Sequence, residues 1–125
     1  MSAVMDAYKL LKEAKIEGIN NIYPNMIPPS KQETTDCTDI LITDVIQRYT
    51  DFGSDIPTTV DEVISLNIFY GLNADTNFEE IEENLVSFFY KNYWFVTYSA
   101  GHTIDPDTKQ TTKILQFQRK KQRSF

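Results

Sequence analysis

The period of the apolar residues changes twice in the second half of this chain, and this change constrains the fold most. In VDEVISLNIFYGL, residues 60–72, apolar side chains alternate from Ile64 to Tyr70, which predicts a strand with one apolar face. In TNFEEIEENLVSFFYKN, residues 76–92, they recur every three or four positions, as in a helix. Alternation returns in YWFVTYSAGH and TTKILQFQRK. A helix enclosed by strands predicts an α+β domain.

The segment 76–92 carries the most complete helix signals. Thr76 and Glu79 have the spacing of a capping box, in which each side chain bonds the backbone N–H of the other residue. Glu79 and Glu80 lie near the positive end of the expected helix and Lys91 near its negative end, as the helix dipole favours. The stripe expected to face the core consists of Phe78, Ile81, Leu85, Phe88 and Phe89.

The first half of the chain predicts one helix and two short strands. Residues 2–17 show helical spacing and end before Gly18, whereas the prolines of residues 19–39 favour an extended edge segment or a long loop. Residues 40–45, ILITDV, predict a buried strand, and residues 47–59 predict a loop. The expected fold is one domain, 1–125, with two helices on a mostly antiparallel sheet and a basic C-terminal tail, 119–125.

Charge is divided unevenly along the chain, whose net charge is −6. Residues 36–83 contain twelve acidic residues and one basic residue, whereas residues 91–125 contain seven basic residues and two acidic ones. A molecule of two signs can meet copies of itself head to tail. Charge that varies between solvated faces accounts for the same division equally well.

Candidate catalytic residues are few. His102 is the only histidine, and a catalytic role with Asp105 or Asp107 would require a nucleophile within hydrogen-bond reach. Cys37, the only cysteine, lies between Asp36 and Asp39, whose charges oppose formation of the thiolate. The sequence contains neither a Gly-x-Ser-x-Gly motif nor a glycine-rich phosphate loop. We expect no enzyme, and a hydrolase that uses His102 is the weakest alternative.

Cofactor, metal, nucleic-acid and membrane sites are not expected either. Residues 73–84 have the alternate spacing of a calcium loop, but Phe78 occupies the position that needs glycine and Asn84 the one that needs an acid. A net negative domain does not favour specific binding of nucleic acid. The N-terminus does not resemble a signal peptide, and no apolar run approaches the roughly 20 residues that span a bilayer.

The glutamates of the 76–92 helix raise one question about partners. Glu79, Glu80, Glu82 and Glu83 are expected on its outer surface, where like charges three and four residues apart repel each other. A basic surface would relieve this repulsion, and residues 109–123 are the basic segment of the chain. We therefore expect an acid–base contact between subunits.

Several segments together resemble a known family. They are IYPNMIPPS, TDILITDV, SLNIFYG, Trp94 and GHTIDPDTKQTTKILQF. The last contains Asp105-Pro106-Asp107, a turn sequence that predicts a hairpin. From about Ile22 to Arg119 the chain resembles small tail proteins of phages with long, non-contractile tails that infect Gram-positive bacteria.

This resemblance implies a structural role in the virion, at the junction of head and tail. It implies a tail terminator or tail-completion protein that forms a hexameric ring, caps the tail tube and contacts the head connector. The implied partners are further copies of the chain, the tail tube protein and a connector or stopper protein, with DNA passing through the ring. A head-completion or connector-stopper protein and a soluble regulatory or inhibitor protein remain alternatives.

The candidate interface residues fall into three groups. The hairpin tip contributes His102, Asp105, Asp107 and Lys109, and the loop at 50–58 contributes Asp51, Gly53 and Asp55. The expected acid–base contact contributes Glu80, Glu83, Arg119, Lys120 and Lys121. Polar exposed loops are frequent sites of contact, and contacts that close a ring join two different patches.

Overall fold

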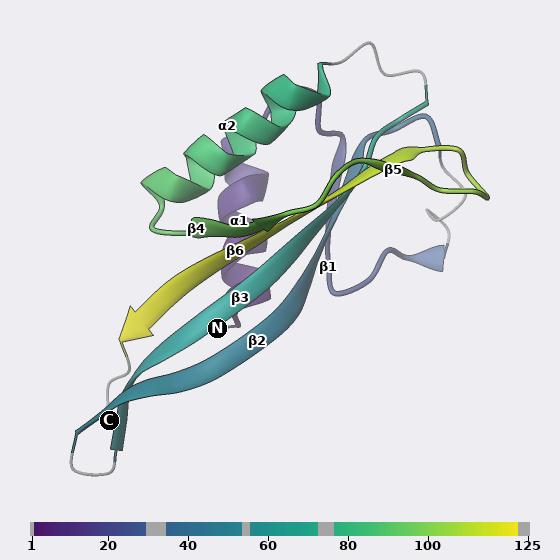
Figure 1. Ribbon diagram of the computed structural model, residues 1–125. Helices are drawn as coiled ribbons and strands as arrows, with labels where there is room; N and C mark the ends of the chain where they lie inside the picture. The colour runs from purple at the N-terminus through teal and green to yellow at the C-terminus, as the bar shows by residue number, and fades with distance from the viewer. Residues whose placement is uncertain (1, 30–34, 54–55, 73–76, 123–125) are drawn as a thin grey trace.

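A computed structural model describes residues 2–29, 35–53, 56–72 and 77–122, and for residues 49–53, 56–58 and 121–122 it describes the backbone alone. In these residues two helices, α1 (Ala3–Ala14) and α2 (Phe78–Lys91), pack on a sheet of six strands (Figure 1). The sheet is mixed and mostly antiparallel, which confirms the expected α+β class.

The order of the strands places two different strands at the edges of the sheet. The strands are β1 (Asn21–Pro24), β2 (Asp39–Gly53), β3 (Ile56–Phe69), β4 (Phe95–Ser99), β5 (Thr103–Ile104) and β6 (Thr111–Gln122). They lie in the order β1-β2-β3-β6-β4, and β5 also pairs with β6. β1 runs parallel to β2 and ends at Pro24, so the proline-rich segment does supply an edge strand. β4 forms the opposite edge.

Both helices begin at a polar cap. The Ser2 hydroxyl accepts a hydrogen bond from the Met5 N–H at 3.2 Å, and α1 ends at Lys15, which is left-handed with φ 50°. The helix is therefore shorter than the predicted 2–17. The capping-box prediction is wrong for α2, because Asn77 is the N-cap and accepts from the Glu80 N–H at 3.3 Å. Thr76 lies outside the described residues.

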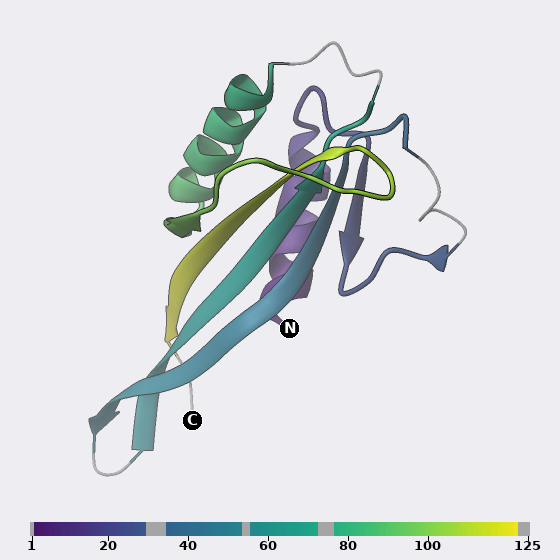
Figure 2. The same ribbon diagram turned by 45° about the vertical axis from the view of Figure 1, so that its right-hand side comes forward.

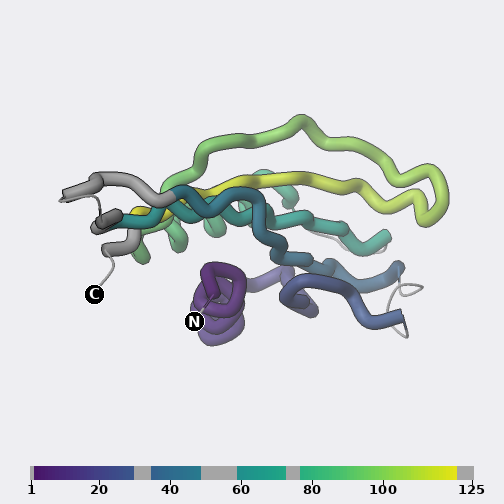
Figure 3. The backbone as a smooth tube through the Cα atoms, turned by 90° about the horizontal axis from the view of Figure 1, so that it is seen from below, coloured from purple at the N-terminus to yellow at the C-terminus, as the bar shows by residue number. Residues whose placement is uncertain are grey.

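The two helices cover the same face of the sheet. Buried residues of α1 and α2 form one cluster with Ile40 and Ile42 of β2, the alternating Ile64, Leu66 and Ile68 of β3, and Leu115 and Phe117 of β6. Ile81, Leu85 and Phe89 are the buried residues of α2, as the helical stripe predicted. Figure 3 shows the sheet nearly edge-on, with α1 on one side of it.

A long hairpin arm replaces the loop predicted at residues 47–59. β2 and β3 stay paired from Ile46↔Val63 to Gly53↔Ile56, and the arm projects beyond the helices (Figures 1 and 2). Among the described residues Pro57 pairs with β2 alone, because the described part of β6 ends before it, and a proline is tolerated where a strand has a neighbour on one side. β6 accompanies β3 as far as Thr59↔Gln122. Residues 119–122, predicted as a tail, are therefore strand, and residues 123–125 lie outside the described chain.

Candidate functional site

A cluster of polar side chains surrounds Glu82 under the β4–β5 connection. Glu82 Oε2 accepts a hydrogen bond from the Tyr70 hydroxyl at 2.6 Å and lies 2.7 Å from His102 Nε2. Lys113 Nζ lies 3.9 Å from Glu82 Oε1. The Glu82 side chain is only 13% exposed. The expectation that Glu82 belongs to the outer surface of the helix is therefore wrong, because this carboxylate points inward to three partners.

Four parts of the fold meet in this cluster. Tyr70 directly follows β3, Glu82 belongs to α2, His102 precedes β5, and Lys113 lies in β6. The Lys113 ammonium also donates to the Ala100 carbonyl, and the Tyr70 ring stacks on Phe78 with centroids 3.9 Å apart. Burial raises the pKa of Tyr70 above its usual value, and the hydrogen bond to Glu82 and the charge of Glu82 raise it further. The cluster holds the β4–β5 connection against α2.

The polar groups of this cluster bond to one another, and these bonds provide the anchoring. Its imidazole and its carboxylate contact each other, and the Tyr70 hydroxyl shares the same carboxylate oxygen. Asp105 and Asp107 are the acidic partners that the sequence suggests for His102, whereas its partner in the structure is Glu82, twenty residues earlier. No spacing rule connects residues 70, 82, 102 and 113, so only the folded chain brings them together.

The hairpin tip between β5 and β6 has the turn chemistry that its sequence predicted. Asp105 Oδ1 accepts hydrogen bonds from the Asp107 N–H at 2.8 Å and the Thr108 N–H at 3.2 Å. The left-handed Lys109, with φ 66°, donates its N–H to the Asp105 carbonyl at 2.8 Å. Asp107 and Lys109 are exposed, so the tip presents one charge of each sign.

Arg119 and Lys120 of β6 find acidic partners within the chain. Arg119 donates to Glu62 at 3.0 Å and to Asp6 at 2.7 Å, and its guanidinium lies 4.6 Å from the centroid of the Trp94 ring. Lys120 lies 3.8 Å from Asp61. These ion pairs join β6 to β3 and α1.

The remaining candidate interface residues are distributed over the molecule. Glu80 and Glu83 are exposed on α2, and no described residue forms an ion pair with either. Asp51 and Gly53 lie in β2, in the hairpin arm, and Asp55 lies outside the described residues. The backbone of Lys121 pairs with Val60. The interface roles of all twelve residues stay predictions.

The edge strand β4 exposes several large apolar side chains. All five of its residues are exposed, including Phe95 at 50%, Val96 at 43% and Tyr98 at 53%. Tyr93, just before it, is 79% exposed. An apolar groove of about 370 Å³ lies between α2 and this edge, with Val86, Tyr90 and Leu115 among its walls. Among the aromatic residues from Tyr90 to Tyr98, Trp94 alone is buried.

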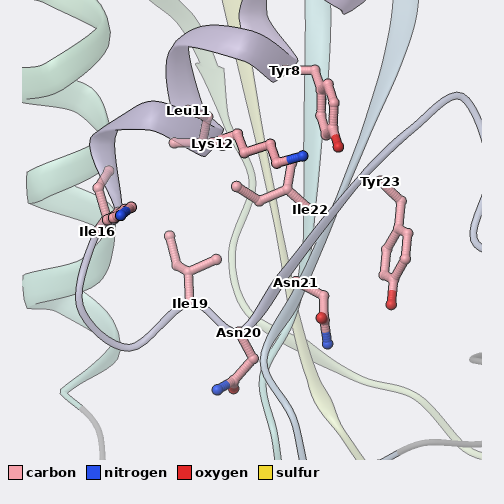
Figure 4. A pocket seen from close by; sticks show the side chains of 10 residues that line it. Tyr8, Leu11, Lys12, Ile16, Ile19, Asn20, Asn21, Ile22 and Tyr23 are labelled. Atoms are coloured by element: carbon pink, nitrogen blue, oxygen red, sulfur yellow. The ribbon is translucent and has the colours of Figure 1, made fainter.

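A cavity of about 400 Å³ lies at the opposite edge, between the end of α1 and β1 (Figure 4). Ile16, Ile19 and Ile22 supply apolar surface, and the Lys12 side chain runs across it toward Tyr8 (Figure 4). Lys15 also lines the cavity. Among the described residues, no group of three His, Cys, Asp or Glu side chains is arranged to hold a metal ion.

These features define a small α+β fold with one helix-covered sheet face and two dissimilar edge strands. The model of one protein family, described as "Protein of unknown function (DUF806)", matches residues 2–122. The chain therefore belongs to this family. No curated protein matches it. Neither α1 nor α2, the helices within the described residues, is long and apolar enough to cross a membrane.

Proposed function

We propose that this chain is a structural protein of a phage tail, a tail terminator that caps the tail tube and forms its interface with the head connector. It acts as a hexameric ring in the virion. The observation that carries the proposal is the exposed apolar edge strand β4, which favours assembly. The resemblance between residues 22 and 119 and small siphophage tail proteins supplies the biological setting.

An exposed edge strand is normally protected in a protein that stays monomeric. Lysines, prolines or very short strands keep such an edge from pairing with other chains. β4, with the sequence FVTYS, contains none of these charges or prolines, and the adjoining Tyr90 and Tyr93 are 65% and 79% exposed. Large exposed apolar surface marks a site of protein contact. This edge therefore favours an assembly protein over a monomeric one.

The two edges of the sheet suit a ring. β1 and β4 differ in length, direction of pairing and side chains. A contact that uses both edges joins two unlike patches, and repetition of such a contact closes into a ring or continues as a filament. The hairpin arm of β2 and β3 extends past the helices and is available for a different neighbour, such as the tube protein or the connector (Figure 2).

Native mass spectrometry across a range of protein concentrations tests this function, with negative-stain images of any assembled fraction. We expect a discrete sixfold species with a central hole. If the chain is monomeric alone, purified tail tubes are added, and binding at one tube end is expected. A chain that neither assembles nor binds tube ends would refute the proposal.

The alternative virion role is distinguished by position. A head-completion or connector-stopper protein would label the portal side of heads that lack tails, whereas a terminator labels free tail tubes. Gold-labelled chain added separately to the two particles gives one pattern or the other. A soluble regulatory protein would bind neither particle and would instead be recovered with a host protein.

A further inference from the structure

The surface around the cavity at the β1 edge combines apolar surface with positive charge. We call it the α1–β1 surface, and it consists of Tyr8, Lys12, Lys15, Ile19, Ile22 and Tyr23. Lys12 and Lys15 are exposed, and neither forms an ion pair with any residue that the structure describes. The acidic residues of the same segment, Glu13 and Glu17, do not line the cavity. Lys12 lies across the hollow with its ammonium 5.6 Å from the centroid of the Tyr8 ring, and Lys15 also lines it. An apolar hollow lined by two basic side chains suits an apolar side chain accompanied by carboxylates.

The surface at the β4 edge has the opposite character. We call it the α2–β4 surface, and it consists of Glu79, Glu83, Tyr90, Tyr93 and Phe95. All five side chains are exposed, and the rings of Tyr90 and Phe95 meet edge to face with centroids 5.6 Å apart. The two glutamates have no ion-pair partner among the described residues. Aromatic side chains, tyrosine among them, are enriched among the residues that dominate binding energy in interfaces, and polar or charged groups lie at the rim.

These two complementary surfaces cannot meet within one chain. α1 packs against β1, β2 and β3, whereas α2 packs against β4, and β1 and β4 are the opposite edges of the sheet. Figure 1 shows α2 and β4 together, away from β1. Surfaces that match in charge but lie at opposite edges can be joined only between two copies.

We propose that the α2–β4 surface of one copy docks on the α1–β1 surface of the next copy. The exposed aromatic side chains of the α2–β4 surface contact the apolar cavity, and Glu79 and Glu83 face Lys12 and Lys15. The proposal deepens the proposed function, on which it rests for self-assembly, by naming the two surfaces of the subunit contact. It differs from the acid–base contact expected from the sequence, since the bases are those of α1 and not those of β6.

Two charge-reversed variants test the pairing. The first, Lys12→Glu with Lys15→Glu, has two acidic surfaces, and the second, Glu79→Lys with Glu83→Lys, has two basic ones. Each variant alone should assemble at least about a hundredfold more weakly than the natural chain, because like charges across an interface cost several kcal/mol. An equal mixture should regain assembly, with the two variants alternating. Sedimentation velocity and native mass spectrometry measure both effects.

Lys9→Glu is the matched control, because Lys9 lies on the exposed side of α1 but does not line the cavity. It should assemble within about threefold of the natural chain. Circular dichroism of the single variants, together with rescue in the mixture, shows that they are folded. A natural chain that assembles, with variants that assemble equally well, would overturn this pairing and leave the ring intact. If each variant loses assembly and mixing the two does not restore it, the pairing is also wrong. If the natural chain stays monomeric both alone and on tail tubes, the pairing and the ring are both wrong.

Discussion

Gly71 shows at the residue scale how a missing side chain permits two segments to meet. A Cβ at this position would lie 2.4 Å from the Asp36 carbonyl oxygen, which belongs to backbone and cannot rotate away. The Gly71 N–H also donates to the hydroxyl of Thr38 at 3.1 Å, and Thr38 is fully buried. The close approach of residues 36–38 to the end of β3 therefore requires glycine here.

We predict that Gly71→Ala lowers the free energy of unfolding by about 1–3 kcal/mol, the usual cost of overpacking. Gly101→Ala is the control, since a Cβ on Gly101 would meet nothing within 4 Å. That variant should stay within about 0.5 kcal/mol of the natural chain. Urea unfolding measures both. Equal effects of the two substitutions would contradict the close approach at Gly71.

Tyr70 makes the free energy of unfolding depend on pH in the alkaline range. Its pKa is raised in the folded chain by burial and by Glu82, above the value of 10.0 of a free tyrosine. Above pH 10 the unfolded chain loses this proton while the folded chain keeps it, so the stabilisation present below pH 10 is lost as pH rises.

We predict that Tyr70→Phe makes the decline of stability between about pH 9 and 11 shallower, because the group responsible is removed. Its stability at pH 7 should fall, since Glu82 loses a donor. Tyr93→Phe, at an exposed position, serves as the control and should follow the natural chain. Urea midpoints at each pH give the slopes, and parallel curves for the natural chain and Tyr70→Phe would show the prediction to be wrong.

At the scale of elements, the Glu82 side chain joins α2 to the segment between β4 and β5, residues 100–102. The carboxylate accepts from Tyr70, contacts His102 and lies near Lys113, which is buried. Glu82→Gln keeps the shape but removes the charge that these groups face. We predict a loss of about 1–3 kcal/mol, the cost of leaving buried polar groups unsatisfied, and faster amide hydrogen exchange in residues 99–105.

Glu83→Gln provides the comparison, because it removes the same charge one residue away on the exposed side of α2. Exchange in residues 99–105 should then be unchanged. If both variants accelerate exchange alike, the effect comes from the general charge of α2 and not from the contact between Glu82 and His102.

The elements that sequence predicted well are those whose signals are local. Alternation identified the apolar face of β3, and helical spacing identified the buried stripe of α2, because each depends on neighbours within a few residues. The turn at Asp105 was predicted for the same reason. Local propensity failed at residues 47–59, where Gly and Pro indicated a loop but pairing between β2 and β3 prevails.

The candidate sites were predicted less well because they depend on distant residues. Glu82 looked like its neighbours Glu79, Glu80 and Glu83 in the sequence, and only the positions of residues 70, 102 and 113 turn it inward. Alternation in YWFVTYSAGH predicted a strand but not that this strand lies at an edge of the sheet, where Phe95 and Tyr98 are exposed. Whether a strand is central or at an edge is a property of the whole sheet, which periodicity does not report.

At the scale of the whole molecule, Tyr93 relates the stability of one chain to the contact between chains. It is left-handed, with φ 68°, and follows Asn92, the C-cap of α2, at the position where a left-handed residue is usually glycine. This conformation is unfavourable for a residue with a Cβ, and the ring gains little from burial because it is 79% exposed. In the contact with a second copy that is proposed above, the Tyr93 ring would be buried, and this burial would offset the cost of the left-handed conformation.

We predict that Tyr93→Gly changes stability and assembly in opposite directions. The free energy of unfolding of the monomer should rise by about 1 kcal/mol, because glycine adopts a positive φ without the steric cost. Assembly should weaken at least about tenfold, because an aromatic side chain is removed from the interface. Tyr93→Ala separates the two effects, since it removes the ring but keeps a Cβ, and it should lose assembly without gaining stability. Urea unfolding of dilute protein and sedimentation velocity at higher concentration measure the two quantities. A Tyr93→Gly variant that assembles like the natural chain would remove Tyr93 from the contact, because its exposed ring would then serve neither the chain nor the assembly.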